Sequence, residues 1–344
     1  MTQLLPESTL ASFHAVASRE FERAAEHHGR VDRRLRFVDR TVLLRFAGAR
    51  LAGVLLGALA AREDNSDGAP DDRTPDAVVS LWEADDCPGG SVPFPWRWSN
   101  VGTGGLIRET GDGRLVAVHE TCSGTLTLID RTASAMLYRV PHTRAVPWWE
   151  RAAPLRPCLF WALAGDGGHL VHAAAVGDDR GAVLLVGARG SGKTTVAMAA
   201  VNHGLRFVAD DYLLLRSGHT PEAVALYNTV SVAASSRTAS AGDTKAVLDL
   251  RKLMPDALCE SLTVRAVVVP CVSEGRTQLR RVTPVAALRA WAPTTVFQMP
   301  FDDGAVVATL AGVVSSCPCY SLDVGSDEAD LADAVLQVLE QVVS

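Results

Sequence analysis

The chain has 344 residues, of which 48% are hydrophobic and 21% charged, and its formal net charge is −6. This composition is typical of a globular protein with a sizeable buried core, and the length allows two domains. An acidic balance without a long Lys/Arg block argues against nucleic acid as a main partner.

No segment of the sequence indicates export or a membrane span. The start, MTQLLPESTLASF, has no basic region before an apolar core, so we expect no signal peptide. The most apolar run, 51–61, lies between Arg50 and Arg62 and is too short to cross a bilayer, which favours a buried helix. The seven cysteines are odd in number and lie mostly among apolar residues. We therefore expect reduced thiols and a cytoplasmic protein.

The first part of the chain predicts an α+β domain over residues 1–150. Apolar residues at helical spacing predict an amphipathic helix over 7–28, and alternation predicts one or two strands over 35–46. The acidic, turn-rich stretch 62–76 is expected to be an exposed loop. Further strands are expected over 77–82, 114–119 and 125–130.

One segment of this domain leaves two interpretations open. Residues 93–98 read PFPWRW. Exposed aromatic side chains there would bind a peptide or a planar ligand, whereas buried ones would pack a domain edge, and we favour packing. The domain shows no recognisable chemistry, and substrate recognition is one candidate for its role.

A second domain is predicted over 151–344, after a stretch rich in proline and tryptophan. It begins with a short helix over 159–164, a strand over 169–176 and a hairpin turn over 177–181. The apolar run 182–186 then predicts a buried strand.

A complete P-loop motif, GARGSGKT, follows this strand at 187–194. Helix-forming residues continue from Lys193, and Gly204 is expected to end that helix. Glycines let the backbone N–H groups turn toward an anion, and a helix N-terminus favours negative charge. Strand, loop and helix together predict nucleotide-phosphate binding, against the alternative of a glycine-rich turn in an α/β unit.

An acidic pair, Asp210 and Asp211, follows the next apolar run at 205–209. With ATP bound, Lys193 would bridge the β- and γ-phosphates, and Thr194 would give its hydroxyl to Mg²⁺. One carboxylate would hold Mg²⁺ while the other accepts a proton from the attacking hydroxyl, and the residues alone do not order them. A turn or an N-cap is the alternative for such a pair. Further phosphate contacts are expected from Gly187, Gly190, Ser191, Gly192, Lys193 and Thr195.

The rest of the domain contains one stretch without periodicity. The polar residues 228–245 are expected to form a mobile loop, with Lys245 either a charge clamp or a solvated side chain. Cys317 and Cys319 are expected to be buried thiols rather than a metal or redox pair. Strands are expected over 212–215, 263–269, 278–282 and 320–324, and helices over 284–291 and 327–342.

The segment from His172 to Asp211 resembles the HPr kinase/phosphorylase family, and especially its HPr-kinase-like serine kinases. That family carries a histidine in the strand before the P-loop, then the motif itself, a glycine, and a strand ending in Ala-Asp-Asp. This chain has His172, the motif at 187–194, Gly204 and the residues Ala-Asp-Asp at 209–211, and its tail 318–325 is also similar. The resemblance is firm over 165–215 and absent before about 150.

The resemblance implies an α/β fold, namely a P-loop kinase domain of the HPr-kinase-like type preceded by the α+β domain. It implies an ATP- and Mg²⁺-dependent phosphotransferase acting on a serine-type hydroxyl of a peptide, protein or amino acid. It assigns Asp210 as the base and Asp211, with Thr194, as metal ligands. It also makes His172 a phosphate or substrate contact, whereas a histidine on an apolar strand is otherwise a satisfied core residue.

One departure from the family concerns the acceptor. HPr kinases carry a Leu-Glu-Ile-Arg-Gly loop that helps to hold metal and protein substrate, and this chain has the polar stretch 228–245 instead. This argues against HPr as the acceptor and leaves phosphorolysis and a homo-oligomer open. The alternative functions are a P-loop hydrolase or switch, and a nucleotide-binding module that acts through a partner. No N-K-x-D motif occurs, which argues against a GTPase.

Overall fold

A computed structural model describes residues 6–64, 73–108, 113–163, 168–233, 244–297 and 304–342. The fold is mixed α/β and divides into two compact units, Met1–Leu163 and Ala164–Ser344. The sequence places the division after residue 150, and the intervening helices belong to the first unit. Within the described residues, no helix is both long enough and apolar enough to span a membrane.

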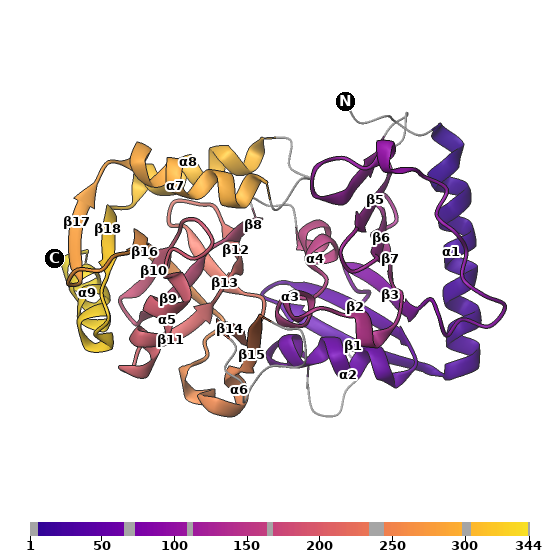
Figure 1. The fold of residues 1–344 in the computed structure, drawn as a ribbon, viewed down its shortest axis with the longest axis horizontal. Coiled ribbons are helices and arrows are strands. Elements are labelled where there is room, and N and C mark those ends of the chain that lie inside the picture. The colour runs from indigo at the N-terminus through magenta and orange to yellow at the C-terminus, as the bar shows by residue number, and fades with distance from the viewer. Residues whose placement is uncertain are drawn as a thin grey trace. The chain divides into compact units, whose positions relative to one another are not determined.

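In the first unit, the described residues form one mixed sheet of seven strands (Figure 1). In sheet order these are β1 (Arg30–Phe37), β2 (Arg40–Ala47), β3 (Ala77–Glu83), β7 (Ala135–Val140), β6 (Thr125–Asp130), β5 (Leu115–Glu120) and β4 (Leu106–Arg108). β2, β3 and β7 run parallel, and the other neighbours are antiparallel. The strands predicted between 35 and 130 are confirmed.

The predicted amphipathic helix is confirmed as α1 (Glu7–His28), which buries Leu10, Phe13 and Phe21 against the sheet. The helix predicted over 51–61 starts as α2 (Ala49–Leu55) and continues as a 3₁₀ helix, η1 (Leu56–Arg62). Of the predicted loop 62–76, residues 65–72 lie outside the described residues. The remaining helices of the unit are α3 (Trp148–Ala152), α4 (Arg156–Leu163), η2 (Trp98–Asn100), η3 (Thr103–Gly105) and η4 (Thr143–Ala145).

The aromatic segment 93–98 divides between its two interpretations. Trp96 is buried and stacks on Phe94, with ring centroids 4.9 Å apart. Trp98 is 70% exposed and lies parallel to the His119 ring. Two of the three aromatic side chains, those of Phe94 and Trp96, therefore pack the unit, as favoured, while Trp98 remains on the surface.

In the second unit, nine of the described strands form one mixed sheet (Figure 1). Along the main path these are β11 (Arg206–Ala209), β9 (Ala174–Asp178), β10 (Gly181–Leu185), β16 (Ser261–Val272), β13 (Glu222–Ala225), β12 (Tyr212–Arg216) and β8 (Gly168–His172). β18 (Cys319–Val324) pairs with the later part of β16, and β17 (Gln278–Val282) pairs with β18. β10, β16 and β18 are parallel.

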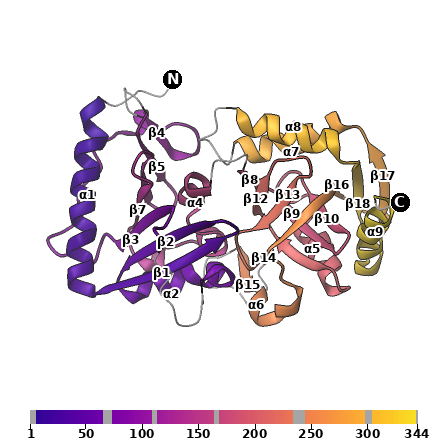
Figure 2. The same cartoon turned by 180° about the vertical axis from the view of Figure 1, so that it is seen from behind.

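Helices cover both faces of this sheet, and Figure 2 shows the arrangement from behind. α5 (Lys193–Asn202) and α9 (Glu328–Gln341) pack on one face, while α7 (Pro284–Val296) and α8 (Ala305–Ser316) pack on the other. Two apolar clusters result, one on each side of the buried strands. Gly204 ends α5 as predicted, with φ +93°. Short helices α6 (Leu250–Leu253) and η5 (Pro255–Ala257) complete the unit.

Two predictions for this unit need correction. The strand expected over 169–176 is two strands, β8 and β9, because the chain leaves one part of the sheet and enters another at Ala173. The stretch 228–245 is not a loop throughout, since β14 (Thr229–Ala233) and β15 (Lys245–Asp249) pair as antiparallel strands. Residues 234–243 lie outside the described residues. The sequence pattern did not indicate β13 or α8.

The predicted burial of the thiols of Cys317 and Cys319 is confirmed. None of the seven forms a disulfide, and Cys317 and Cys319 are both buried. Their thiols donate to main-chain carbonyl oxygens, including those of Val264 and Val314. Burial raises the pKa of both thiols, that of Cys319 to about 11, so neither is a ready metal ligand or nucleophile.

Candidate functional site

The P-loop and the acidic pair lie at one edge of the second unit's sheet. β16 is parallel to β10, and β11 runs in the same direction because β10 and β11 are both antiparallel to β9. The carboxyl ends of these strands therefore meet at one edge, where ligands bind in α/β sheets. Residues 187–194 follow β10, and Asp210 and Asp211 follow β11.

The backbone of the P-loop depends on its glycines. Gly187, Gly190 and Gly192 have φ values of +133°, +82° and +102°, a region that other residues rarely adopt. A Cβ on Gly192 would lie only 3.0 Å from a methyl carbon of Val324, so a side chain there would have to displace that valine by a few tenths of an ångström. α5 begins at the next residue, and no side chain caps its N-terminus. Its first N–H groups can therefore bind an anion.

Lys193 is buried within this loop and is 5% exposed. Its Nζ donates to the carbonyl oxygens of Gly187 and Ala188, at 2.9 and 3.1 Å. Burial lowers the pKa of Lys193, and the carboxylates of Asp211 and Asp210 oppose that change. The ammonium group is thus held in the loop, close to both acidic side chains.

Thr194 connects the P-loop to the acidic pair. Its hydroxyl donates to the carboxylate of Asp210, lying 3.0 Å from Oδ1 and 3.1 Å from Oδ2. Asp210 is 5% exposed, so this contact is shielded from solvent. In P-loop nucleotide enzymes, a P-loop hydroxyl and one carboxylate hold Mg²⁺ together. The structure brings Thr194 together with Asp210 in this way.

The protonation of Asp210 is set by its surroundings. Burial, followed by the negative charge of Asp211, raises the pKa of Asp210 to about 7. The Thr194 hydroxyl, the main-chain N–H of Ser231 and the charge of Lys245 act in the opposite direction. Ser231 belongs to β14 and Lys245 begins β15, so the paired strands supply contacts to the site. Residue type gives no sign of a main-chain donor, which is why the sequence did not point to Ser231.

His172 lies beside the second carboxylate. Its Nε2 is 3.6 Å from Oδ1 of Asp211. Burial lowers the pKa of His172, and the interaction with Asp211 opposes that change. The pKa of Asp211 is lowered overall because His172, Lys245 and Lys193 outweigh the effect of burial. Asp211 also has φ +66°, a conformation that costs a non-glycine residue about 1–3 kcal/mol and is often found at functional sites.

Helix α7 fixes the position of His172. The His172 N–H donates to the Thr295 hydroxyl, and Trp291 Nε1 donates to the His172 carbonyl oxygen, both at 3.2 Å. The imidazole Nδ1 is buried and has no hydrogen-bond partner in the described part of the chain. Buried polar atoms are nearly always paired, so this nitrogen is available to a ligand. The sequence did not indicate Trp291 or Thr295, which act from more than a hundred residues away.

The oxygen and nitrogen donors of the P-loop and the acidic pair are of the kinds that bind Mg²⁺ and a nucleoside triphosphate. The described residues contain no group of three His, Cys, Asp or Glu side chains placed to hold a metal by themselves. Mg²⁺ does not need one, because it is usually held by one or two carboxylates, a hydroxyl, substrate phosphates and water. Asp210 and Thr194 would provide the protein's share of the ligands. The buried Ser191 hydroxyl has no partner among the described residues, which leaves a further donor in the loop.

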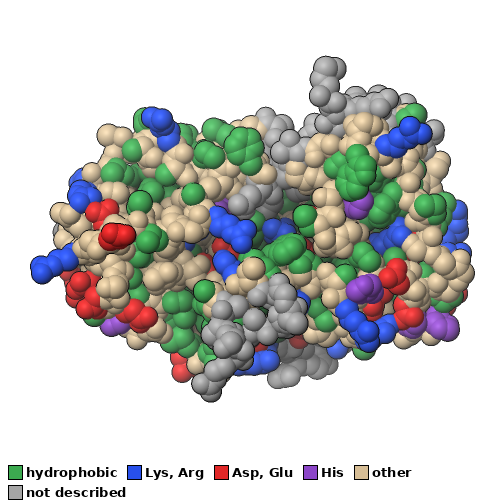
Figure 3. All heavy atoms as spheres, viewed as in Figure 1, with side chains coloured by type: hydrophobic (Ala, Val, Ile, Leu, Met, Phe, Trp, Pro, Cys, Tyr) green, Lys and Arg blue, Asp and Glu red, His purple; other side chains and the backbone are tan. Residues whose placement is uncertain are grey.

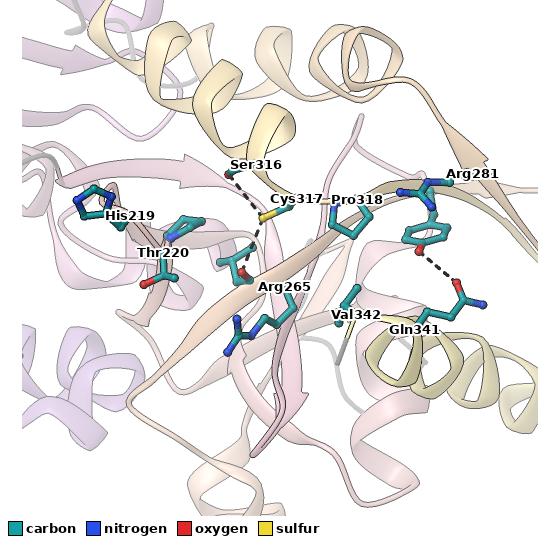
Figure 4. Close-up of a pocket in the computed structure, with 12 residues that line it drawn as sticks. His219, Thr220, Arg265, Arg281, Ser316, Cys317, Pro318, Gln341 and Val342 are labelled. Carbon is teal, nitrogen blue, oxygen red and sulfur yellow. Dashed lines mark hydrogen bonds between the residues drawn. The ribbon is translucent and has the colours of Figure 1, made fainter. Parts of the chain in front are cut away.

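A separate cavity of about 520 Å³ lies at the opposite edge of the sheet (Figure 4). Residues near the start of β16, including Arg265, and residues around the start of β18, including Pro318 and Tyr320, contribute to its lining. The P-loop lies near the other ends of these strands, so the cavity is separate from the site that the P-loop and the acidic pair form.

Comparison with known proteins adds little. A scan against protein-family models finds no match, and a search of curated proteins finds none either. Among solved structures, one similar chain is the Hpr(Ser) kinase/phosphatase from Coxiella burnetii. The match has 13% identity, covers 51% of this chain and 97% of that chain, and has a TM-score of 0.32. An identity and a TM-score this low support no inference about the fold or the function of this chain.

Proposed function

We propose that the chain is an ATP- and Mg²⁺-dependent kinase that transfers the γ-phosphate to a serine-type hydroxyl of a peptide, protein or amino acid. One observation carries the proposal, namely the contact of the Thr194 hydroxyl with Asp210 next to the glycine-bent loop. The contact unites a phosphate cradle with a carboxylate in the arrangement that phosphoryl transfer requires. The sequence resemblance to HPr-kinase-like serine kinases supports the same class.

Binding of the triphosphate falls to the loop. The N–H groups at the start of α5 hold the phosphate oxygens, and Lys193 turns from its two carbonyl partners to the β- and γ-phosphates. Thr194 and Asp210 would hold Mg²⁺, which would supply positive charge to neutralise the charge that develops on the phosphates. Phosphoryl transfer depends mainly on such positioning and charge neutralisation, and this site provides both.

The geometry favours an order of the carboxylates opposite to the one that the family resemblance implies. Asp210 contacts the metal-binding hydroxyl, so we assign it to Mg²⁺. Asp211 has a lowered pKa and a side chain that is 28% exposed, so it is ionised and open to an incoming hydroxyl. We therefore assign the base to Asp211, with His172 as the residue that orients it.

A kinase and a P-loop hydrolase differ only in what attacks the γ-phosphate. The His172–Asp211 pair offers an ionised base that accepts the proton of either nucleophile, and the sequence resemblance to serine kinases favours an alcohol. Two acceptors, free L-serine and a serine-containing peptide, are incubated with enzyme, ATP and Mg²⁺. ADP release that depends on an acceptor, together with a gain of one phosphate by that acceptor, supports the kinase. ADP release of equal rate without any acceptor supports the hydrolase.

Lys193→Ala distinguishes either enzyme from a contaminating activity. Loss of the Lys193 ammonium removes the charge that bridges the β- and γ-phosphates, so turnover is expected to fall below detection. Wild-type turnover in this variant would remove the P-loop from the proposed function.

A further inference from the structure

An exposed apolar residue stands at the ligand-binding edge of the sheet. Val272 is the last residue of β16 and is 61% exposed, whereas Val267 and Val268 earlier in the strand are buried. Scattered exposed valines are ordinary on protein surfaces. Val272 differs because it lies where parallel strands end beside a P-loop, the usual place of a nucleotide.

Val272 and Val324 together form a short apolar wall against the P-loop. They are partners in the parallel pairing of β16 and β18. A Cβ built on Gly192 would lie 3.0 Å from Val324 Cγ2 and 3.5 Å from Val272 Cγ2. The wall therefore touches the turn of the loop that leads into α5.

The wall and the acidic pair lie on opposite sides of the P-loop. In the sheet, β10 is flanked by β9 and then β11 on one side, and by β16 on the other. Thr194 and Asp210 mark the β11 side, where Mg²⁺ and the terminal phosphates belong. A bound nucleotide that places its terminal phosphate there has its other end directed to the β16 side.

Two hydroxyl groups next to the wall lack partners. Ser273 Oγ and Thr277 Oγ1 are buried and form no hydrogen bond within the described residues. Both belong to the turn after β16, and Thr277 packs against Gly325, directly after Val324, where a Cβ would lie 2.8 Å from the Thr277 hydroxyl. Ribose hydroxyls and base nitrogens are groups that such donors bind, beside an apolar surface that packs a planar ring.

We propose that Val272 and Val324, with the hydroxyls of Ser273 and Thr277, bind the nucleoside half of the nucleotide. This inference rests on the proposed function, since it assigns the end of the triphosphate ligand that the P-loop does not hold. Apolar contact and hydroxyl pairing at this wall give the site affinity for a nucleoside triphosphate over a bare polyphosphate.

The test compares Mg·ATP with Mg·tripolyphosphate, which has the phosphates but no nucleoside. Binding of each is measured by calorimetry to wild type, Val272→Asn and the control Val285→Asn, whose valine is 65% exposed on α7. Val272→Asn places an uncharged side chain at an exposed position, so the fold is expected to persist. Loss of the apolar contact is expected to weaken ATP binding about fivefold or more while tripolyphosphate binding stays unchanged. Thr277→Val is expected to weaken ATP binding in the same selective way.

Three outcomes would contradict the proposal that Val272 and Val324 bind the nucleoside. ATP binding to Val272→Asn as tight as to wild type would place the nucleoside elsewhere. Equal losses for ATP and tripolyphosphate would show that Val272 supports the loop and not the nucleoside. Equal effects of Val272→Asn and Val285→Asn would show a nonspecific loss. Wild-type protein that binds neither ligand would instead overturn the proposed function itself, a result distinct from these three.

Discussion

The Thr194 hydroxyl lies 3.0 and 3.1 Å from the two carboxylate oxygens of Asp210, which joins the P-loop to the strand that follows its helix. The contact is local in sequence, since one strand and one helix separate the two residues. Most P-loop proteins bring this carboxylate from a more distant strand. Here a short segment of the chain carries both the P-loop and this carboxylate.

The first prediction concerns the Thr194 hydroxyl. Thr194→Val removes it at nearly constant volume, so Mg²⁺-dependent ATP binding is expected to weaken at least tenfold, because the metal loses one ligand. Thr194→Ser keeps the hydroxyl and is expected to bind nearly as wild type. Calorimetry with and without Mg²⁺ checks this. Equal binding by the valine and serine variants would mean that the hydroxyl does not serve the metal.

The second prediction concerns the pH dependence of stability without metal. The pKa of Asp210 is raised to about 7, so the native state resists ionisation that the unfolded chain undergoes near pH 4. Its contribution to stability is fully present below about pH 4 and is lost as pH rises through about 7, by up to about 4 kcal/mol. Asp210→Asn removes this loss, so it is expected to raise the free energy of unfolding at about pH 8 and to leave it unchanged near pH 4.

Urea unfolding in the presence of a chelator measures this effect. Asp178→Asn is a control of opposite sign, because the Arg180 guanidinium lowers the pKa of Asp178. That variant is expected to destabilise the protein at about pH 8 and to lose its effect as pH falls below about 4. Destabilisation by Asp210→Asn at about pH 8 would show that ionisation of the Asp210 carboxylate does not destabilise the metal-free protein.

The third prediction separates the roles of the two carboxylates. Asp211→Asn is expected to keep Mg²⁺-dependent ATP binding and to lower the transfer rate by about a hundredfold or more, because the proton acceptor is gone. Asp210→Asn is expected to weaken Mg²⁺-dependent binding as well. Binding constants and single-turnover rates decide between them. The reverse pattern would return the base to Asp210 and the metal to Asp211, as the family resemblance implies.

The fourth prediction concerns the paired strands β14 and β15. Lys245 opposes the raised pKa of Asp210 and contributes to the lowered pKa of Asp211. Lys245→Met removes this positive charge, so the lower pH limit of the transfer rate, set by ionisation of Asp211, is expected to move to higher pH. Lys252→Met is the matched control, since that side chain is 77% exposed and pairs with Asp249. An unchanged pH profile in the Lys245 variant would show that the charge of Lys245 on β15 does not affect phosphoryl transfer.

The sequence predicted the parts of the site that are consecutive in the chain. The order of strand, glycine turn, helix and acidic pair follows from local rules, namely backbone freedom at glycine, helix-forming residues after Lys193, and Gly204 as a stop. The structure agrees over this whole stretch, with α5 starting at Lys193 and Gly204 at positive φ.

Contacts between distant segments were not predictable in the same way. Trp291 and Thr295 hold the backbone of His172 from α7, and Ser231 reaches Asp210 through a main-chain N–H. Such contacts depend on how the sheet is assembled and leave no periodic pattern in the sequence. The polar composition of 228–245 also concealed β14, because a short two-stranded ladder needs few apolar residues.

Transfer of the γ-phosphate itself is the most direct test of the central claim. Enzyme, Mg²⁺ and ATP labelled on the γ-phosphate are incubated with L-serine and with serine peptides, and label on the acceptor and ADP release are measured together. The site described here predicts label on a hydroxyl acceptor in step with ADP, lost in both Lys193→Ala and Asp211→Asn. ATP turnover that persists in the Lys193 variant, or wild-type protein that neither binds nor turns over Mg·ATP, would contradict it.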